Sequence, residues 1–146
     1  TGFRFAGVEQ ACPAYGVIEA LHQADLVVLC PSNPWVSLDP ILAIPEVTAA
    51  IGTHRVVGVS PIIGGKTVKG PAAKMFAELG IPASALAVAQ HYGSLLSGFL
   101  LDDQDSGQAD AVQRLDILPY VTQTIMRTQS DRRHLALEVL EFSKML

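Results

Sequence analysis

The sequence has few of the residues that mark several common classes of protein. It contains only two cysteines, Cys12 and Cys30, too few for a disulfide framework or a zinc site, and both are predicted to be reduced and packed as small apolar side chains. Lys and Arg number 10 in a chain of net charge −4, and no basic cluster is long enough to follow a phosphate backbone. Nucleic acid is therefore not an expected partner.

Long apolar runs are also missing. No stretch reaches the 18 or so consecutive apolar residues of a membrane span, and no signal peptide is recognisable. The prediction is a cytoplasmic protein with no membrane partner. Hydrophobic residues still make up 49% of the 146 residues, which is enough for a core, and the length predicts a single α/β domain over residues 1–146.

Apolar segments of strand length alternate with helical segments. Continuous apolar runs, as in residues 24–30 and 55–60, are typical of parallel strands buried on both faces. The predicted fold is a Rossmann-like, doubly wound, mostly parallel sheet with helices on both faces. The predicted strands are residues 24–30, 55–60, 86–89, 98–101 and 117–121, with a weak candidate at 3–5. The predicted helices are residues 13–23, 71–79, 109–115 and 130–144, with a further helix ending near Ile51.

Parallel sheets bind ligands beyond the carboxyl ends of their strands, and three loops are predicted to lie there. Ser32 and Asn33 directly follow the strand at residues 24–30 and are held between two prolines. Their short polar side chains suit phosphate, ribose or a metal-bound water. The alternative is a capping turn into the next helix.

The loop at residues 64–70 (GGKTVKG) is the most unusual stretch of the chain. Gly64 and Gly65 let the backbone approach an anion, and a helix predicted to start at Pro71 adds partial positive charge. Lys66 and Lys69 add full charges. The spacing matches neither a Walker loop nor a dinucleotide fingerprint. The alternative is a surface loop with solvated lysines.

His91 follows the predicted strand at residues 86–89 and is a candidate to bind phosphate or exchange a proton, with a structural hydrogen bond to loop backbone as the alternative. Trp35 is expected to cover the core. The acidic run Asp102–Asp103–Asp105 is interpreted as a solvated turn, with a hard-cation site as the less favoured alternative. No metal-ligand cluster is predicted.

Four segments together resemble one family, and they appear in its expected order: CPSNPWVSLDPILAIPEV, VVGVSPIIGGKTVKGPAAKMFAELG, AVAQHYGSLLSGFLLDD and VTQTIMRTQSDRRHLALEVLEF. The chain resembles the carboxy-terminal half of the 2-phospho-L-lactate transferases of coenzyme F420 biosynthesis. The resemblance covers nearly the whole chain. One departure is Asp39, which stands where the family pattern predicts glycine.

The resemblance implies an enzyme. Such enzymes transfer a phospholactyl or phosphoenolpyruvyl group from a guanosine diphosphate conjugate to the deazaflavin precursor Fo, release GMP and require Mg²⁺. Ser32 and Asn33 would lie near the diphosphate, and Gly64, Gly65 and Lys66 would hold the nucleotide. Catalytic, Fo-binding and metal-binding residues are expected in an amino-terminal half, so this chain alone is expected to be inactive or incomplete.

Two other functions stay open on the sequence. One is a non-catalytic regulator of related fold that binds a nucleotide or sugar nucleotide, and the other is a fragment with no function of its own. Binding of Fo would distinguish the transferase from the regulator. The sequence leaves undecided the donor acid and whether the protein is a homodimer.

Overall fold

The computed structural model describes residues 3–67 and 72–146, and the side chains of residues 75–146 in the second range. Four strands form a sheet in the order β1-β2-β5-β6, and every neighbouring pair is parallel. The predicted α/β fold with a mostly parallel sheet is confirmed. The strands are β1 (Val27–Leu29), β2 (Val56–Val59), β5 (Gly98–Leu101) and β6 (Leu118–Val121), and a separate antiparallel hairpin is made by β3 (Ile62–Ile63) and β4 (Lys66–Thr67).

The helices connect these strands and begin at recognisable signals. Pro45 opens α3 at its first turn, and Thr128 and Asp131 form a reciprocal capping box at the start of α7. The longer helical elements are α1 (Val17–His22), η2 (Pro34–Leu38), α2 (Asp39–Leu42), α3 (Pro45–Ile51), α4 (Ala72–Glu78), α5 (Ala85–Tyr92), η4 (Asp103–Gln108), α6 (Ala109–Gln113) and α7 (Gln129–Ser143). Two short 3₁₀ turns are η1 (Val8–Gln10) and η3 (Gly93–Leu95).

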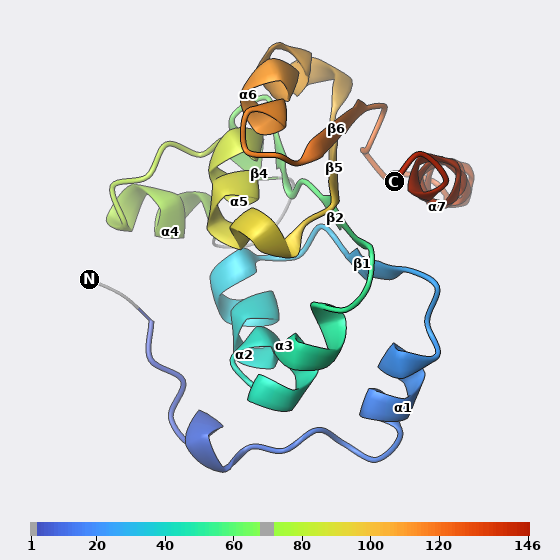
Figure 1. The fold of residues 1–146 in the computed structure, drawn as a ribbon. Coiled ribbons are helices and arrows are strands. Elements are labelled where there is room, and N and C mark those ends of the chain that lie inside the picture. Colours follow the sequence, from blue (N-terminus) through green and yellow to red (C-terminus); the bar gives the residue numbers. More distant parts are fainter. Residues whose placement is uncertain (1–2, 68–71) are drawn as a thin grey trace.

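The strand order decides which face each connection covers. Along the chain, each new strand lies next to the preceding one and always at the same edge of the sheet. Right-handed crossovers then place all the connecting helices on one face. Helix α7 follows the last strand and packs on the opposite face. Figure 1 shows α7 on one side of the sheet, with α2, α4 and α5 on the other.

Two separate hydrophobic clusters follow from this arrangement. The larger joins the sheet residues Leu29, Val56 and Phe99 to the connecting helices, and Trp35 and Phe76 belong to it. The smaller joins the opposite face of the sheet to α7, and its buried members are Val57, Val59, Leu100, Leu135, Val139 and Phe142. Adjacent strand residues therefore enter different clusters, as the alternation of side chains in a strand requires.

Several predicted elements are wrong or shorter than expected. Residues 86–89 are not a strand but the middle of α5, because Ala85, Val88 and Ala89 are buried at helical spacing and the Ser84 side chain accepts from the Ala87 amide at 3.0 Å. Residues 3–5 form no strand. The predicted strand at 24–30 shortens to β1 and is not buried on both faces, since Val28 is 37% exposed.

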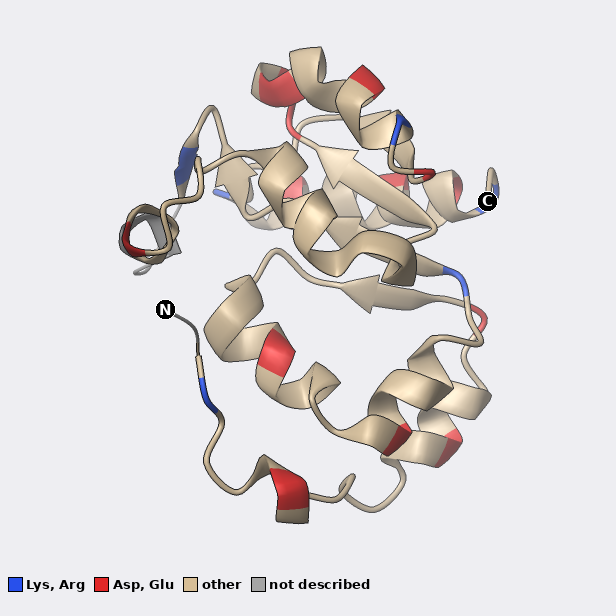
Figure 2. Ribbon diagram, turned by 60° about the vertical axis from the view of Figure 1, so that its left-hand side comes forward, with Lys and Arg blue, Asp and Glu red and all other residues tan. Residues whose placement is uncertain are grey.

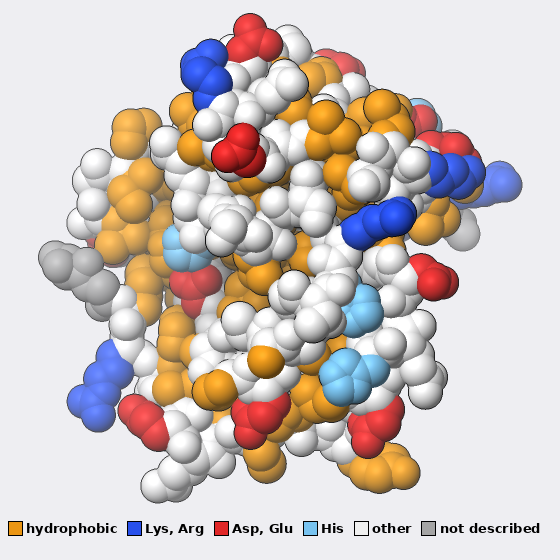
Figure 3. Space-filling model, viewed as in Figure 1, with side chains coloured by type: hydrophobic (Ala, Val, Ile, Leu, Met, Phe, Trp, Pro, Cys, Tyr) orange, Lys and Arg blue, Asp and Glu red, His pale blue; other side chains and the backbone are white. Residues whose placement is uncertain are grey.

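Charged residues are dispersed over many elements of the ribbon (Figure 2). On the face seen in Figure 3, some Lys and Arg side chains lie close together near the right-hand edge, beside acidic ones, and others lie apart. None of the helices within the described ranges has the combination of length and apolar character that a membrane span requires.

Candidate functional site at the carboxyl edge of the sheet

Polar side chains follow all four parallel strands at the edge where the strands end. Ser32 and Asn33 follow β1, Ser60 follows β2, Asp102 follows β5 and Thr124 lies shortly after β6. Because the strands are parallel, these positions share one edge of the sheet. This edge is the candidate site, and its residues differ in how far their polar groups are already engaged.

Asn33 caps the helical segment that follows β1. Its Oδ1 accepts from the Trp35 amide at 3.0 Å and from the Val36 amide at 3.4 Å, and its Nδ2 donates to the Met75 sulfur at 3.1 Å. The segment it caps, η2, is a π-helix, a form that is frequent at functional sites. The capping turn predicted as the alternative for Asn33 is therefore formed, and its amide also links η2 to α4.

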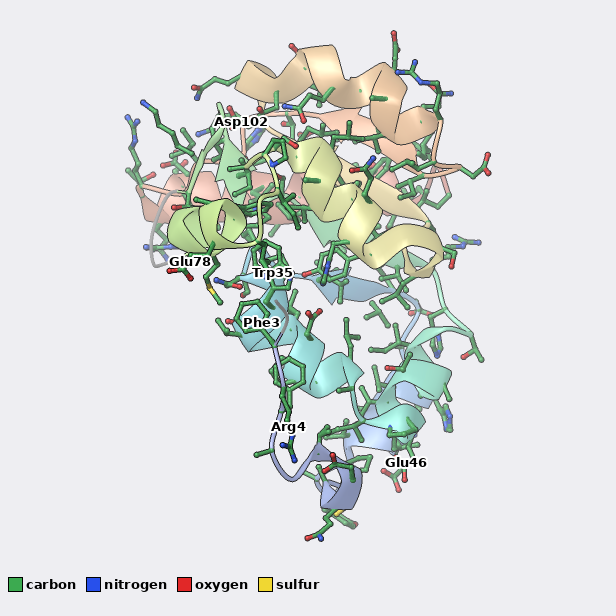
Figure 4. All side chains as sticks on the ribbon, turned by 90° about the vertical axis from the view of Figure 1, so that its left-hand side faces the viewer. Phe3, Arg4, Trp35, Glu46, Glu78 and Asp102 are labelled. Atoms are coloured by element: carbon green, nitrogen blue, oxygen red, sulfur yellow. The ribbon has the colours of Figure 1, made fainter. Side chains whose placement is uncertain are left out.

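Trp35 is buried, as predicted, and lies among other rings. It meets Phe76 edge-on at 4.5 Å between ring centroids, and Phe3 stacks on it at 6.2 Å. Figure 4 shows Phe3 beside Trp35, apart from Asp102. Ser32 is half-buried, and within the described part of the chain its hydroxyl forms no hydrogen bond. Ser32 is thus the residue of this pair whose side chain is uncommitted.

Gly64 and Gly65 form the two-residue turn of the β3–β4 hairpin. Their φ angles are +56° and +74°, which a type I′ turn requires at both central positions and which glycine adopts without strain. The glycines are therefore explained by the turn, whereas the sequence suggested a loop leading directly into a helix. Lys66 follows the turn and is exposed. Lys69 and Pro71, the other predicted features of this loop, lie outside the described residues.

Asp102 and Asp105 are buried, at 2% and 4% exposure, so the predicted solvated turn is wrong at these two positions. One oxygen of Asp102 accepts from the backbone and side-chain nitrogens of Gln104, and the other accepts from the amide and hydroxyl of Thr124. Asp105 accepts from the Gly64 amide and from the Gln108 side chain. The signal was available in the sequence, because Asp102 directly follows an apolar strand just as Ser32 follows another.

The two buried carboxylates are not arranged to bind a metal ion. All four of their oxygens accept hydrogen bonds from protein donors. In the described ranges, no group of three or more His, Cys, Asp or Glu side chains converges as a metal site would require. Asp102 and Asp105 therefore do not fit a magnesium ion, and the resemblance places the expected Mg²⁺ ligands in an amino-terminal half.

His91 lies in the last turn of α5 and not at the end of a strand, because the segment before it is helical. Its Nε2 is 2.7 Å from Oδ1 of Asp39, and its ring meets Trp35 edge-on at 5.7 Å. The neighbouring Tyr92 hydroxyl is buried. This burial, and to a smaller extent the negative charge of Asp39, raises the pKa of Tyr92 above its ordinary value. The alternative predicted for His91 was a hydrogen bond to loop backbone, but its partner is the Asp39 side chain.

Both cysteines are exposed, so their predicted packing in the core is wrong. Cys30 is one residue past β1, where the short strand has already ended and the chain turns outward. Neither thiol lies within a cluster of metal-ligating side chains in the described ranges.

Comparison with known proteins identifies the family. The sequence model of the family described as 2-phospho-L-lactate transferase CofD matches residues 2–140. The chain belongs to this family. It is 42% identical over 141 residues to a phosphoenolpyruvate transferase of Streptomyces griseus, a match that covers 94% of this chain and 44% of the relative.

Two further relatives with the same name agree with this assignment. The match to the protein of Streptomyces coelicolor is 50% identical over 112 residues and covers 75% of this chain and 34% of the relative. The match to the protein of Thermobifida fusca is 44% identical over 118 residues and covers 80% of this chain and 37% of the relative. The chain therefore spans less than half the length of these transferase-family relatives.

Proposed function

We propose that this chain forms part of a transferase of coenzyme F420 biosynthesis that acts on a guanosine diphosphate conjugate and the deazaflavin Fo. The observation that carries the proposal is the family match over residues 2–140. The relatives named phosphoenolpyruvate transferase favour an enolpyruvyl rather than a lactyl donor. The family match also supports a transferase over a regulator of related fold.

The proposed reaction is transfer of a phosphorus group between oxygens. An Fo hydroxyl oxygen forms a bond to the phosphorus that carries the organic acid, the bond from that phosphorus to the GMP oxygen breaks, and the hydroxyl proton is released. In such transfers the protein mainly positions the groups and neutralises charge. No covalent nucleophile is needed, and the carboxyl edge offers the positioning groups.

The donor is proposed to lie over the carboxyl edges of β1 and β2. There the uncommitted Ser32 hydroxyl and the exposed Lys66 ammonium are the groups of this chain suited to phosphate oxygens. Asn33 would act indirectly by holding η2, and Lys69 is a further proposed contact outside the described residues. His91 is held by Asp39, so a donor contact from it would require that pair to open.

We propose that the residues that contact Fo and Mg²⁺ belong to the part of the relatives that this chain does not match. The support is that this chain covers 34–44% of those relatives and that its own buried carboxylates are engaged in hydrogen bonds. On this proposal the chain alone binds the nucleotide and does not complete the transfer.

The test is titration of the full-length protein that contains this chain with GDP and with Fo separately, in wild type and Lys66→Ala. One charged hydrogen bond is worth roughly 1.5–3 kcal/mol, so the variant should bind GDP about 10- to 150-fold more weakly. Fo affinity should be nearly unchanged, because Fo carries no phosphate. The matched control is Lys144→Ala, which removes an exposed lysine directly after α7 that is paired with Glu141.

Equal loss of both ligands in Lys66→Ala would indicate general collapse of the site. No loss of GDP affinity would show that Lys66 is a solvated lysine, as its exposure also permits, and would contradict the proposed position of the donor.

A further inference from the structure

A chain of hydrogen bonds runs behind the β3–β4 hairpin. The Gly64 amide donates to Oδ2 of Asp105 at 2.9 Å, and Nε2 of Gln108 donates to Oδ1 of Asp105 at 2.9 Å. The Leu86 amide, in the first turn of α5, donates to Oε1 of Gln108 at 2.9 Å. Asp105 is thus the buried link between the hairpin turn and the start of a core helix.

The chemistry of the groups fixes the direction of every bond in this chain. A carboxylate has only acceptors, and a backbone amide has only a donor. Gln108 must therefore present its NH₂ to Asp105 and its oxygen to Leu86, and no other orientation satisfies both neighbours. A change of one side chain between acid and amide breaks the chain, whereas exchange of both can preserve it.

The hydrogen bond to Asp105 decides which groups of the turn are available to an anion. The Gly64 amide is already bonded to Asp105. The Gln104 side chain packs closely against Gly64, because a Cβ at Gly64 would lie 3.0 Å from its side-chain oxygen. Gly65 and Lys66, which follow in the chain, are exposed. The turn is therefore fixed at Gly64 by a buried carboxylate, while Gly65 and Lys66 stay accessible to a ligand.

We infer that Asp105 is a positioning residue for nucleotide binding, which fixes the hairpin so that Gly65 and Lys66 meet the donor diphosphate. The inference rests on the proposed function, since it needs a phosphate ligand at this hairpin. In this proposal Asp105 itself makes no contact with the ligand, because it is buried and both its oxygens accept hydrogen bonds from the protein. Gln108 supports it by holding the carboxylate against α5.

The test exchanges acid and amide between the two side chains. Asp105→Asn leaves two donor groups facing each other in every orientation of the two amides, and Gln108→Glu sets two carboxylates against each other. The double variant Asp105→Asn with Gln108→Glu can make all three hydrogen bonds again, with the same formal charge as wild type. Asp103→Asn is the matched control, because Asp103 is an exposed carboxylate two residues away.

Two quantities are measured in each variant: the exchange rate of the Gly64 amide proton by NMR, and the Kd for GDP by calorimetry. Each single variant should speed Gly64 exchange and weaken GDP binding by roughly tenfold, the effect of one charged hydrogen bond. The double variant should restore both to within about threefold of wild type. The control should change neither.

The outcomes separate the inference from the proposed function. If wild type does not bind GDP, the proposed function is wrong and the inference falls with it. If wild type binds GDP but Asp105→Asn behaves like Asp103→Asn, or the double variant restores neither quantity, only the inference is overturned. Should Asp105→Asn fail to fold, Gln108→Met replaces it, since it leaves the bond from Gly64 to Asp105 in place but frees the carboxylate; it should weaken GDP binding by about threefold.

Discussion

The two faces of the sheet are covered in different ways. On one face, the connecting helices bury side chains that include Phe99, Phe76 and Val88, each at most 1% exposed. On the other face, α7 is the covering helix among the described residues, and a pocket of about 410 Å³ lies between α7 and the strands β1 and β2. Val28 and Leu140 line this pocket and are 37% and 54% exposed.

The difference follows from chain order. Each crossover is bound to the sheet at both ends by a strand, so its helices cannot leave without disrupting the strands. Helix α7 is bound through β6 at its start only, and the cluster beneath it is the smaller one. We therefore expect amides under the crossovers to exchange only through global unfolding, and amides under α7 to exchange through local opening as well.

The largest expected contrast is between two buried phenylalanines. Phe99→Ala and Phe142→Ala each remove a side chain with 0% exposure, and such changes cost about 3–5 kcal/mol. Phe99→Ala should lower protection from hydrogen exchange throughout the sheet. Phe142→Ala should lower it first in α7. Native-state exchange at increasing denaturant measures both, and a uniform loss in both variants would contradict the comparison.

A second contrast uses two strand glycines on opposite faces. A Cβ at Gly98 would lie 2.6 Å from the Phe142 ring, and one at Gly58 would lie 2.9 Å from the Phe99 ring. Overpacking of a core costs about 1–3 kcal/mol, and we expect Gly58→Ala to be near the top of that range and Gly98→Ala near the bottom. The reason is that α7 can shift outward, whereas Phe99 is enclosed. Denaturant unfolding of both variants gives the order, and a larger cost at Gly98 would reverse this argument.

The smallest expected effect concerns the start of α7. Hydrogen bonds from the backbone amides of Thr128 and Arg127 lower the pKa of the Asp131 carboxyl below its ordinary value of 3.8. A depressed pKa stabilises the fold above the unfolded value, and this contribution is lost as pH falls through the folded value. Thermal melts between about pH 6 and about pH 3 should therefore show a slightly steeper acid loss in wild type than in Asp131→Asn. Equal slopes would show that the cap is not coupled to stability.

The sequence was a good guide to the fold where one pattern had one explanation. The apolar runs at β2 and β5 are such local signals, and both segments form strands. The prediction failed at residues 86–89, because a short apolar run fits a buried strand and a buried helix equally well. The N-cap at Ser84 was the local signal that favours the helix.

The candidate site was harder to predict because its polar groups bond to residues distant in sequence. Asp105 is 41 residues from Gly64, and Asp102 is 22 residues from Thr124. Composition alone predicted that the acidic run would be exposed to solvent. In the fold, hydrogen-bond donors from other segments compensate the burial of Asp102 and Asp105. The position of Ser32 and Asn33 at the carboxyl edge of the sheet was predictable, because they come shortly after the end of a predicted parallel strand. The role of Asn33 as a cap was correctly included among the alternatives.

The outer side of β1 has consequences for the behaviour of the protein in solution. Within the described residues β1 pairs on one side only, so its outer N–H and C=O groups can accept a strand from another molecule. The strand has three residues, which limits how many such bonds can form and discourages growth of larger aggregates. Cys30 follows directly and is exposed, so contacts between these edges in concentrated samples would become visible as disulfide-linked dimers on a non-reducing gel.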